Sequence, residues 1–253
     1  TAGALAGAWW IMRRPGRGYD GLNIPDVQLA VARRGGHLPV RPALARTAAS
    51  AITIGGGGSA GSEGPVAVVG STVGSFLGRV FRFGPARVRI LVAAGAAGGI
   101  SAAFNAPLAG AFFPLEQVLG SLAAEAFAPV VVSSVTAAVL SHAFFGTSPA
   151  LTAPVEHAVP GGLEMLAFFP LLGVLTALGG VLFVRVYFRT QDAVEKVRMP
   201  PAAVAALGGV LVGGLLLLSD GRLAGAGHLS FPPGLFGEFA WWTLLLLAGG
   251  KIL

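Results

Sequence analysis

One carboxylate stands in the middle of long apolar sequence, and its surroundings suggest a role in binding ions. Glu63 lies in the stretch GGGGSAGSEGPVAVVG, residues 55–70, which holds seven glycines and a single acid. A charged side chain at the centre of a membrane helix costs about 2.5–3.5 kcal/mol, so an acid there is expected to be functional. Gly64 and Pro65 indicate that a helix begins directly after the acid, because proline is favoured at the first helical position.

This predicted helix start gives Glu63 a specific chemistry. The free N–H groups of the first turn would face the same point as the carboxylate. A helix N-terminus carries about half a positive charge and binds anions. Glu63 is therefore expected to occupy an anion site as a tethered anion; the alternative is that it only caps its own helix.

A second segment has the same arrangement of a turn, a proline and a helix start. It consists of Gly21, Leu22, Asn23, Ile24 and Pro25. A second helix N-terminus directed at the same point would deepen an electropositive well without adding a full charge. The alternative is an ordinary cytoplasmic turn.

The stretch ISAAFNAPLAGAFFPLEQVLG, residues 100–120, places small residues at close spacing. Such faces let membrane helices approach each other closely. Asn105, before Ala106 and Pro107, is expected to cap between two helices. Glu116 and Gln117 are expected at the cytoplasmic end of the second helix, where a solvated helix end is the alternative to a functional role.

Two enzyme signatures are present only in part. Gly57 to Gly61 matches the G-x-S-x-G nucleophile elbow, with Ser59 as nucleophile and His142 as the one histidine near its expected depth. The elbow needs a preceding strand and a histidine paired with an acid, and no strand pattern is present. The glycine run also lacks the Gly-Lys-Ser/Thr of a phosphate loop. An enzyme is not expected.

Metal and cofactor sites are not expected either. The chain has no cysteine, which excludes disulfides and thiolate ligands, and its four histidines form no i, i+4 pair.

The composition places these residues in a membrane. Of 253 residues, 54% are apolar and 11% are charged, against about 25% charged in soluble domains. Four stretches without charge, 90–115, 126–155, 165–184 and 199–219, reach or pass the roughly 20 residues that cross a bilayer as a helix. The sequence therefore predicts an all-α, polytopic membrane protein. Both ends lie in apolar segments, and we expect a fragment of a longer membrane protein, incomplete at both ends.

The charges predict the orientation. The net charge of +6 comes from clusters between apolar runs, as the positive-inside rule produces at cytoplasmic loops, rather than from a nucleic-acid surface. With the loops near 13–17, 33–46, 79–89 and 185–198 on one side, 15 of the 17 Lys and Arg residues are cytoplasmic. Helices are expected to end near 12 and to cover 25–34, 41–55, 64–81, 86–104, 107–117, 122–145, 162–189, 200–219 and 237 onward.

Several of these helices are too short or too broken to cross alone. Helix 64–81 must start at mid-membrane and descend, and 86–104 must rise again. Broken helices whose N-termini meet near the bilayer midplane are typical of ion and solute transporters.

Three motifs together resemble the successive signatures of the CLC family of chloride channels and H⁺/Cl⁻ exchangers. They are Gly21–Pro25, GSEGP at 61–65 and AFNAPLAG at 103–110, in matching order and spacing. The resemblance implies a multi-pass protein of the cell membrane, a homodimer in which each subunit has its own anion pathway built from inverted repeats. Residues 1–145 would form most of the first repeat and 162–253 the start of the second. The partners implied are chloride or a similar small anion, H⁺ in the exchangers, and the lipid bilayer.

The resemblance also implies residue roles. Glu63 would be the gating glutamate, which occupies the anion path when deprotonated, swings away when protonated, and relays H⁺ in exchangers. The anion would be bound by Gly21, Leu22, Asn23, Ile24, Pro25, Gly61, Ser62, Gly64 and Pro65. The inner proton-transfer position would be Gln117, with Glu116 beside it. Helix 107–117 and the span after it would contribute to the dimer interface.

The chain departs from the family pattern at three places. Leu22 stands where a serine hydroxyl is usual, and Asn23 would need a shifted register to replace it. Gln117 stands where exchangers carry a glutamate, and an amide does not titrate; Glu116 would lie about 100° away around a regular helix. A Gly-x-Phe-x-Pro motif and a tyrosine would fall beyond Leu253. Passive conduction, H⁺-coupled exchange and a non-conducting scaffold all remain open.

Overall fold

The computed structural model describes residues 2–13, 22–58, 60–121, 123–146, 166, 168–196, 199–219 and 224–225. These residues form helices and connections, with no strand among them. The elements are α1 (Ala2–Arg13), α2 (Ile24–Arg33), α3 (Val40–Gly55), α4 (Glu63–Val80), α5 (Pro85–Phe104), α6 (Pro107–Pro114), the π-helical turn η1 (Leu115–Leu119), α7 (Ala124–Phe145), α8 (Phe168–Lys196) and α9 (Pro201–Leu218). The all-α prediction is confirmed.

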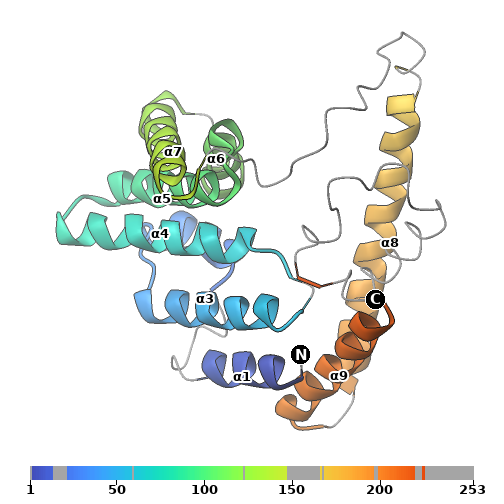
Figure 1. The fold of residues 1–253 in the computed structure, drawn as a ribbon. Coiled ribbons are helices and arrows are strands. Elements are labelled where there is room, and N and C mark those ends of the chain that lie inside the picture. The colour runs from blue at the N-terminus through green and yellow to red at the C-terminus, as the bar shows by residue number, and fades with distance from the viewer. Residues whose placement is uncertain are drawn as a thin grey trace.

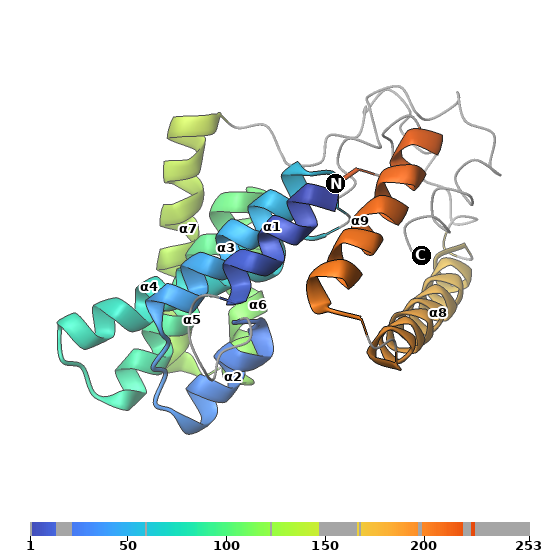
Figure 2. The same ribbon diagram turned by 90° about the horizontal axis from the view of Figure 1, so that it is seen from below.

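Helix α5 is at the centre of the packing. Figure 1 shows α1, α3, α4 and α5 side by side in successive layers, with α6 and α7 on the far side of α5. Figure 2 shows α9 and α8 beyond α1, away from α7. Among the described helices, α5, α7 and α8 are long and apolar enough to cross a membrane, and residues 2–12 of α1 and 202–218 of α9 are shorter apolar segments.

Small residues bring α4 and α5 into backbone contact. A side-chain carbon at Gly70 would overlap the carbonyl oxygen of Gly95, and one at Gly95 would overlap that of Gly70. One turn along, Gly74 faces the carbonyl of Leu91 in the same way. Without glycine at these positions the two helices could not approach this closely, which is how membrane helices pack through small residues.

Serine hydroxyls hold α7 against α5 and α6. Within these apolar helices, hydroxyl groups find their partners in the carbonyl oxygens of neighbouring helices. The four hydrogen bonds run from Ser133 to Ala94, from Ser141 to Ala102, from Ser101 to Ser134 and from Ser134 to Pro107, with donor–acceptor distances of 2.6–2.8 Å.

Two expected helix ends are wrong. The helix expected over 107–117 stops at Pro114 and continues as the wider π-turn η1. Proline inside a helix removes a hydrogen-bond donor and its ring collides with the preceding turn, so a regular helix is disfavoured at Pro114, and the π-turn begins directly after it. The helix expected to end at residue 189 runs on to Lys196, because residues 190–196 contain no glycine or proline to stop it. The helix expected from 237 lies outside the described residues.

Candidate functional site

Glu63 is the first residue of α4, one position earlier than expected. Ser62 precedes it and accepts the Val66 N–H at 3.1 Å, which closes the first turn. Pro65 is buried within that turn, where a missing N–H leaves no hydrogen bond unmade. The acid therefore lies at the positive end of the α4 dipole, where a negative charge is stabilised.

The Glu63 side chain is exposed and folds back over Gly61. A side-chain carbon at Gly61 would overlap the carboxylate oxygen Oε2, so a glycine is required there for this arrangement. Among the described residues, none donates a hydrogen bond to this carboxylate. Gly64, on the other side, has no neighbour within 4 Å of where its side chain would be. The acid is therefore free to change position by rotation of its own side chain.

The second predicted segment divides between core and surface. Leu22 is fully buried and belongs to the hydrophobic core, whereas Asn23 and Pro25 are exposed. Ile24 is half-buried and starts α2. Gly21 lies outside the described residues. Leu22 thus serves the packing of this region, and Asn23 is the residue there with an exposed polar side chain.

Asp26 is a residue that the sequence reasoning missed. Its carboxylate accepts the backbone N–H of Asn23 at 2.8 Å, in the first turn of α2. The spacing Asn-x-x-Asp is a helix-start signature that could have been recognised in the sequence. One of the N–H groups expected to face an anion already has an acceptor, and the acid adds a negative charge at that end of α2.

The structure brings α2 together with the end of the α6–η1 segment. The side-chain amide of Gln28 donates to the backbone carbonyl of Gln117 at 2.5 Å. The side chains of Gln117 and Glu116 are both exposed and lie within hydrogen-bond distance, with Nε2 of the glutamine 3.3 Å from Oε1 of the glutamate. Both residues lie in the π-turn η1 rather than in a regular helix, and their long side chains meet there. Within the described part of the chain, no hydrogen bond joins Glu63 to this group.

Asn105 connects α5 to α6, as expected. Its backbone is left-handed, with φ 53° and ψ 40°, a conformation that asparagine tolerates better than most residues. Its Oδ1 contacts Nε2 of His142 on α7. The histidine considered as a hydrolase base is therefore engaged with an amide.

The described residues do not provide the strand that the hydrolase alternative requires before the G-x-S-x-G match. The G-x-S-x-G match at 57–61 follows helix α3, not the strand from which a nucleophile elbow projects. Ser59 itself lies outside the described residues. In the described part of the chain, no group of three or more His, Cys, Asp or Glu residues is placed to hold a metal ion.

The comparison with known families decides the assignment. The model of the voltage gated chloride channel family matches residues 2–253. The chain belongs to the CLC family. Its members are channels and transporters, so this CLC chain is part of a membrane protein and not an enzyme.

The relatives of this CLC chain include proteins named as channels and proteins named as exchange transporters. A putative chloride channel protein, ClcB-like, of Ralstonia nicotianae is 34% identical over 100% of this chain and 59% of its own length. The H⁺/Cl⁻ exchange transporter ClcA of Vibrio cholerae is 35% identical over 79% of this chain and 43% of its own length. The chain thus spans about half the length of these curated relatives.

Solved structures agree in fold. A slow cyanobacterial Cl⁻/H⁺ antiporter superposes with a TM-score of 0.80 at 27% identity, over 99% of this chain and 59% of that one. A CLC-type fluoride/proton antiporter superposes with a TM-score of 0.71 at 20% identity, over 100% of this chain and 65% of that one. The described helices of this CLC chain therefore adopt the CLC arrangement.

Proposed function

We propose that the protein containing this chain moves chloride or a similar small anion across the cell membrane, with Glu63 as its gate. The observation that carries the proposal is an exposed carboxylate at the positive end of α4, inside the GSEGP motif of a CLC chain, to which none of the described residues donates a hydrogen bond. Such a group occupies the place that an anion would take at a helix N-terminus. Permeation then requires the carboxylate to leave, which protonation favours because it removes the negative charge.

The direct test is a flux measurement in liposomes that contain the purified protein. An outward chloride gradient should release chloride when a potassium ionophore clamps the membrane potential, and release should be faster at acidic than at neutral pH. Matched liposomes without protein are the control. Chloride release that equals this control would contradict the proposal.

The protein is proposed to act as a homodimer that uses the exposed faces of α6 and α7. Leu108 is 76% exposed, and the rings of Phe112 and Phe127 make an edge-to-face contact at 6.5 Å between their centroids. Val132 and Val139 are also exposed on α7. These side chains, the two aromatic rings among them, form the apolar face on which the second subunit is proposed to pack. Residues 1–145 and 162–253 are proposed to belong to successive inverted repeats within each subunit.

Gln117 favours passive conduction over H⁺-coupled exchange. An amide cannot carry a proton between solvent and Glu63, and the side-chain amide of Gln117 contacts the carboxylate of Glu116. Glu116 is exposed and beside it, but no described hydrogen bond extends from this pair toward α4. The wild-type protein is therefore proposed to conduct anions with weak or no proton coupling.

Replacing Gln117 with glutamate is expected to increase proton coupling. In liposomes, a chloride gradient should drive measurable proton uptake in Gln117→Glu and less in the wild type, because the variant places a titratable group at the inner position. A pH electrode records the uptake at clamped membrane potential. Glu116→Gln is the matched control, and it should leave the wild-type behaviour unchanged. Equal proton uptake by Gln117→Glu and the wild type would count against this role for position 117.

A further inference from the structure

The ends of α3 and α4 that lie together form a strongly basic part of the molecule. Residues 27–115 contain one acid, Glu63, against eight arginines. Sixteen residues of helix, about 24 Å, separate Glu63 from Arg79 on α4. Glu63 is therefore too far along α4 to pair with the arginines at the other end of this helix. The arginines are Arg33, Arg34, Arg41, Arg46, Arg79, Arg82, Arg87 and Arg89.

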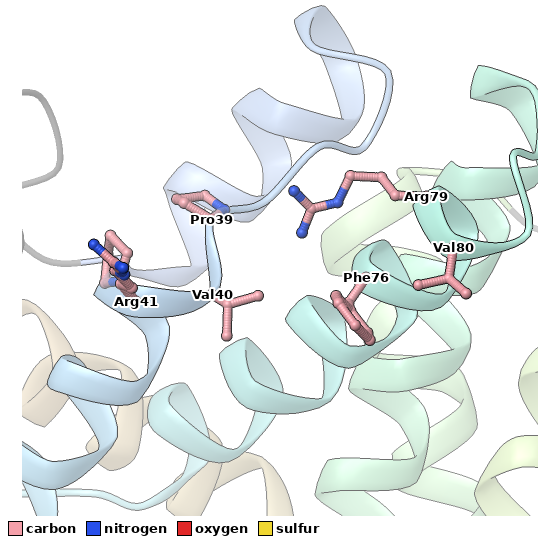
Figure 3. Close-up of a pocket in the computed structure, with 7 residues that line it drawn as sticks. Pro39, Val40, Arg41, Phe76, Arg79 and Val80 are labelled. Atoms are coloured by element: carbon pink, nitrogen blue, oxygen red, sulfur yellow. The ribbon is translucent and has the colours of Figure 1, made fainter.

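A groove of about 730 Å³ lies between the start of α3 and the end of α4. Figure 3 shows Pro39, Val40 and Arg41 on one wall and Phe76, Arg79 and Val80 on the other. Phe76 is 48% exposed and Val80 is 56% exposed, although both are large apolar side chains. The groove thus combines an apolar floor with two cationic side chains.

Arg79 is held in place by the protein. Its Nη2 donates to the backbone carbonyl of Leu38 at 3.2 Å, and the Leu38 N–H donates to Ser75 Oγ at 2.9 Å. Leu38 is buried, so both of its backbone groups are satisfied by side chains of α4. The guanidinium has five N–H donors, and no second acceptor for them is found among the described residues. Arg79 therefore remains able to bind an acceptor from outside.

Arg41 lies in the first turn of α3, where no acid accompanies it. Figure 3 shows its side chain on the opposite side of Val40 from Arg79. It is exposed, and within the described part of the chain it has no ionic or hydrogen-bonded partner. A long, unengaged cation at the mouth of an apolar groove matches the negative end of an amphipathic ligand.

We propose that this groove binds an anionic phospholipid of the cytoplasmic leaflet. The phosphate is held by Arg79, since a guanidinium group binds phosphate oxygens through paired hydrogen bonds, and Arg41, on the other side of Val40, attracts the anionic headgroup to the mouth of the groove. One acyl chain lies along Phe76, Val80 and Val40, whose apolar surface a small soluble anion would leave uncovered. The loops at 33–46 and 79–89 are on the predicted cytoplasmic side, where basic pockets between helices bind lipid headgroups.

The lipid site is tested by retention of lipid through purification. The protein is solubilised in dodecyl maltoside, incubated with phosphatidylglycerol or phosphatidylcholine of the same acyl chains, and analysed by native mass spectrometry. The wild type should retain phosphatidylglycerol in preference to phosphatidylcholine. Arg41→Gln should reduce retention about fivefold, because one basic residue near an anionic surface contributes about 1 kcal/mol. This variant suits the test because, among the described residues, Arg41 has no ionic or hydrogen-bonded partner whose loss would disturb the fold.

Two further variants distinguish the contribution of the lipid headgroup from that of the acyl chain. Arg87→Gln is the matched control, since Arg87 is an exposed arginine on the same side that stacks on Phe83 outside the groove; it should retain the lipid as the wild type does. Phe76→Ser should also lower retention of the lipid, because it removes the apolar wall. Size-exclusion profiles check that each variant is folded.

Three results would overturn the lipid site. The first is equal retention of the two lipids by the wild type. The second is equal loss in Arg41→Gln and Arg87→Gln, which would indicate diffuse attraction to positive charge. The third is displacement of the lipid by soluble glycerol phosphate at equal concentration, which would identify a phosphate site in which the acyl chain plays no part. None of these measurements depends on anion transport, so the lipid site and the proposed function can fail separately.

Discussion

Replacing Glu63 with alanine is expected to abolish the pH dependence of anion flux while flux itself continues. The carboxylate competes with the anion for the same helix end, and removing it leaves that end open at every pH. Chloride release from liposomes at acidic and neutral pH should then be equal in Glu63→Ala, whereas the wild type releases chloride faster at acidic pH. Glu63→Gln should behave in the same way, because the amide resembles the protonated acid in shape and, like the protonated acid, carries no charge.

The control for this experiment is another exposed glutamate at the start of a helix. Glu125 lies in the first turn of α7, so Glu125→Gln removes an equal charge from an equivalent position outside the GSEGP motif. It should keep the pH dependence of the wild type. If Glu63→Ala also retained the wild-type pH profile, the carboxylate would not be the gate, even if the protein conducts chloride.

Replacing Gly95 with valine is expected to prevent the α4–α5 pair from forming. Any side-chain carbon at position 95 would overlap the backbone carbonyl of Gly70, which cannot rotate away as a side chain could. Overpacking of well-packed interiors typically costs about 1–3 kcal/mol, and contact with a rigid backbone should place this variant at or beyond the top of that range. The yield of monodisperse protein in fluorescence-detected size exclusion should fall to a small fraction of that of the wild type.

The matched control is a glycine with open space around it. Gly173 in α8 has no neighbour within 4 Å of where a side chain would be. Gly173→Ala should therefore keep the wild-type yield, and the loss of backbone freedom favours the helix by about 0.5–1 kcal/mol. If Gly95→Val gave as much folded protein as Gly173→Ala, close backbone contact between α4 and α5 would not be required for assembly.

Much of the helical architecture could be predicted from the sequence, because charge gaps and helix breakers are local signals. Pro65, Pro85 and Pro107 mark the first turns of α4, α5 and α6, close to where the helices were expected. Pro114 was also visible in the sequence, but its effect depends on whether the chain kinks, stops or widens into a π-turn. That choice is made by packing around the helix, which periodicity does not describe.

The candidate site was predictable where it depends on one helix end and not where it depends on several elements. Glu63 could be identified because a charged side chain in an apolar membrane sequence costs free energy, and because Pro65, two positions later, marks a helix start. The burial of Leu22 and the contact of Gln28 with Gln117 depend on how α2 packs against its neighbours. The groove at Arg41 and Arg79 joins residues 38 positions apart, at a place where Ser75 and Arg79 of α4 both bind the backbone of Leu38.

The glycine contacts of α4 have a consequence for how a gate at its end can work. Because its backbone touches that of α5 at Gly70 and faces the Leu91 carbonyl at Gly74, α4 cannot roll or slide without its backbone colliding with that of α5. The opening that we propose is therefore confined to torsions of one side chain on a stationary scaffold. Such a switch moves a few atoms, leaves the protein's outline unchanged, and needs no hinge.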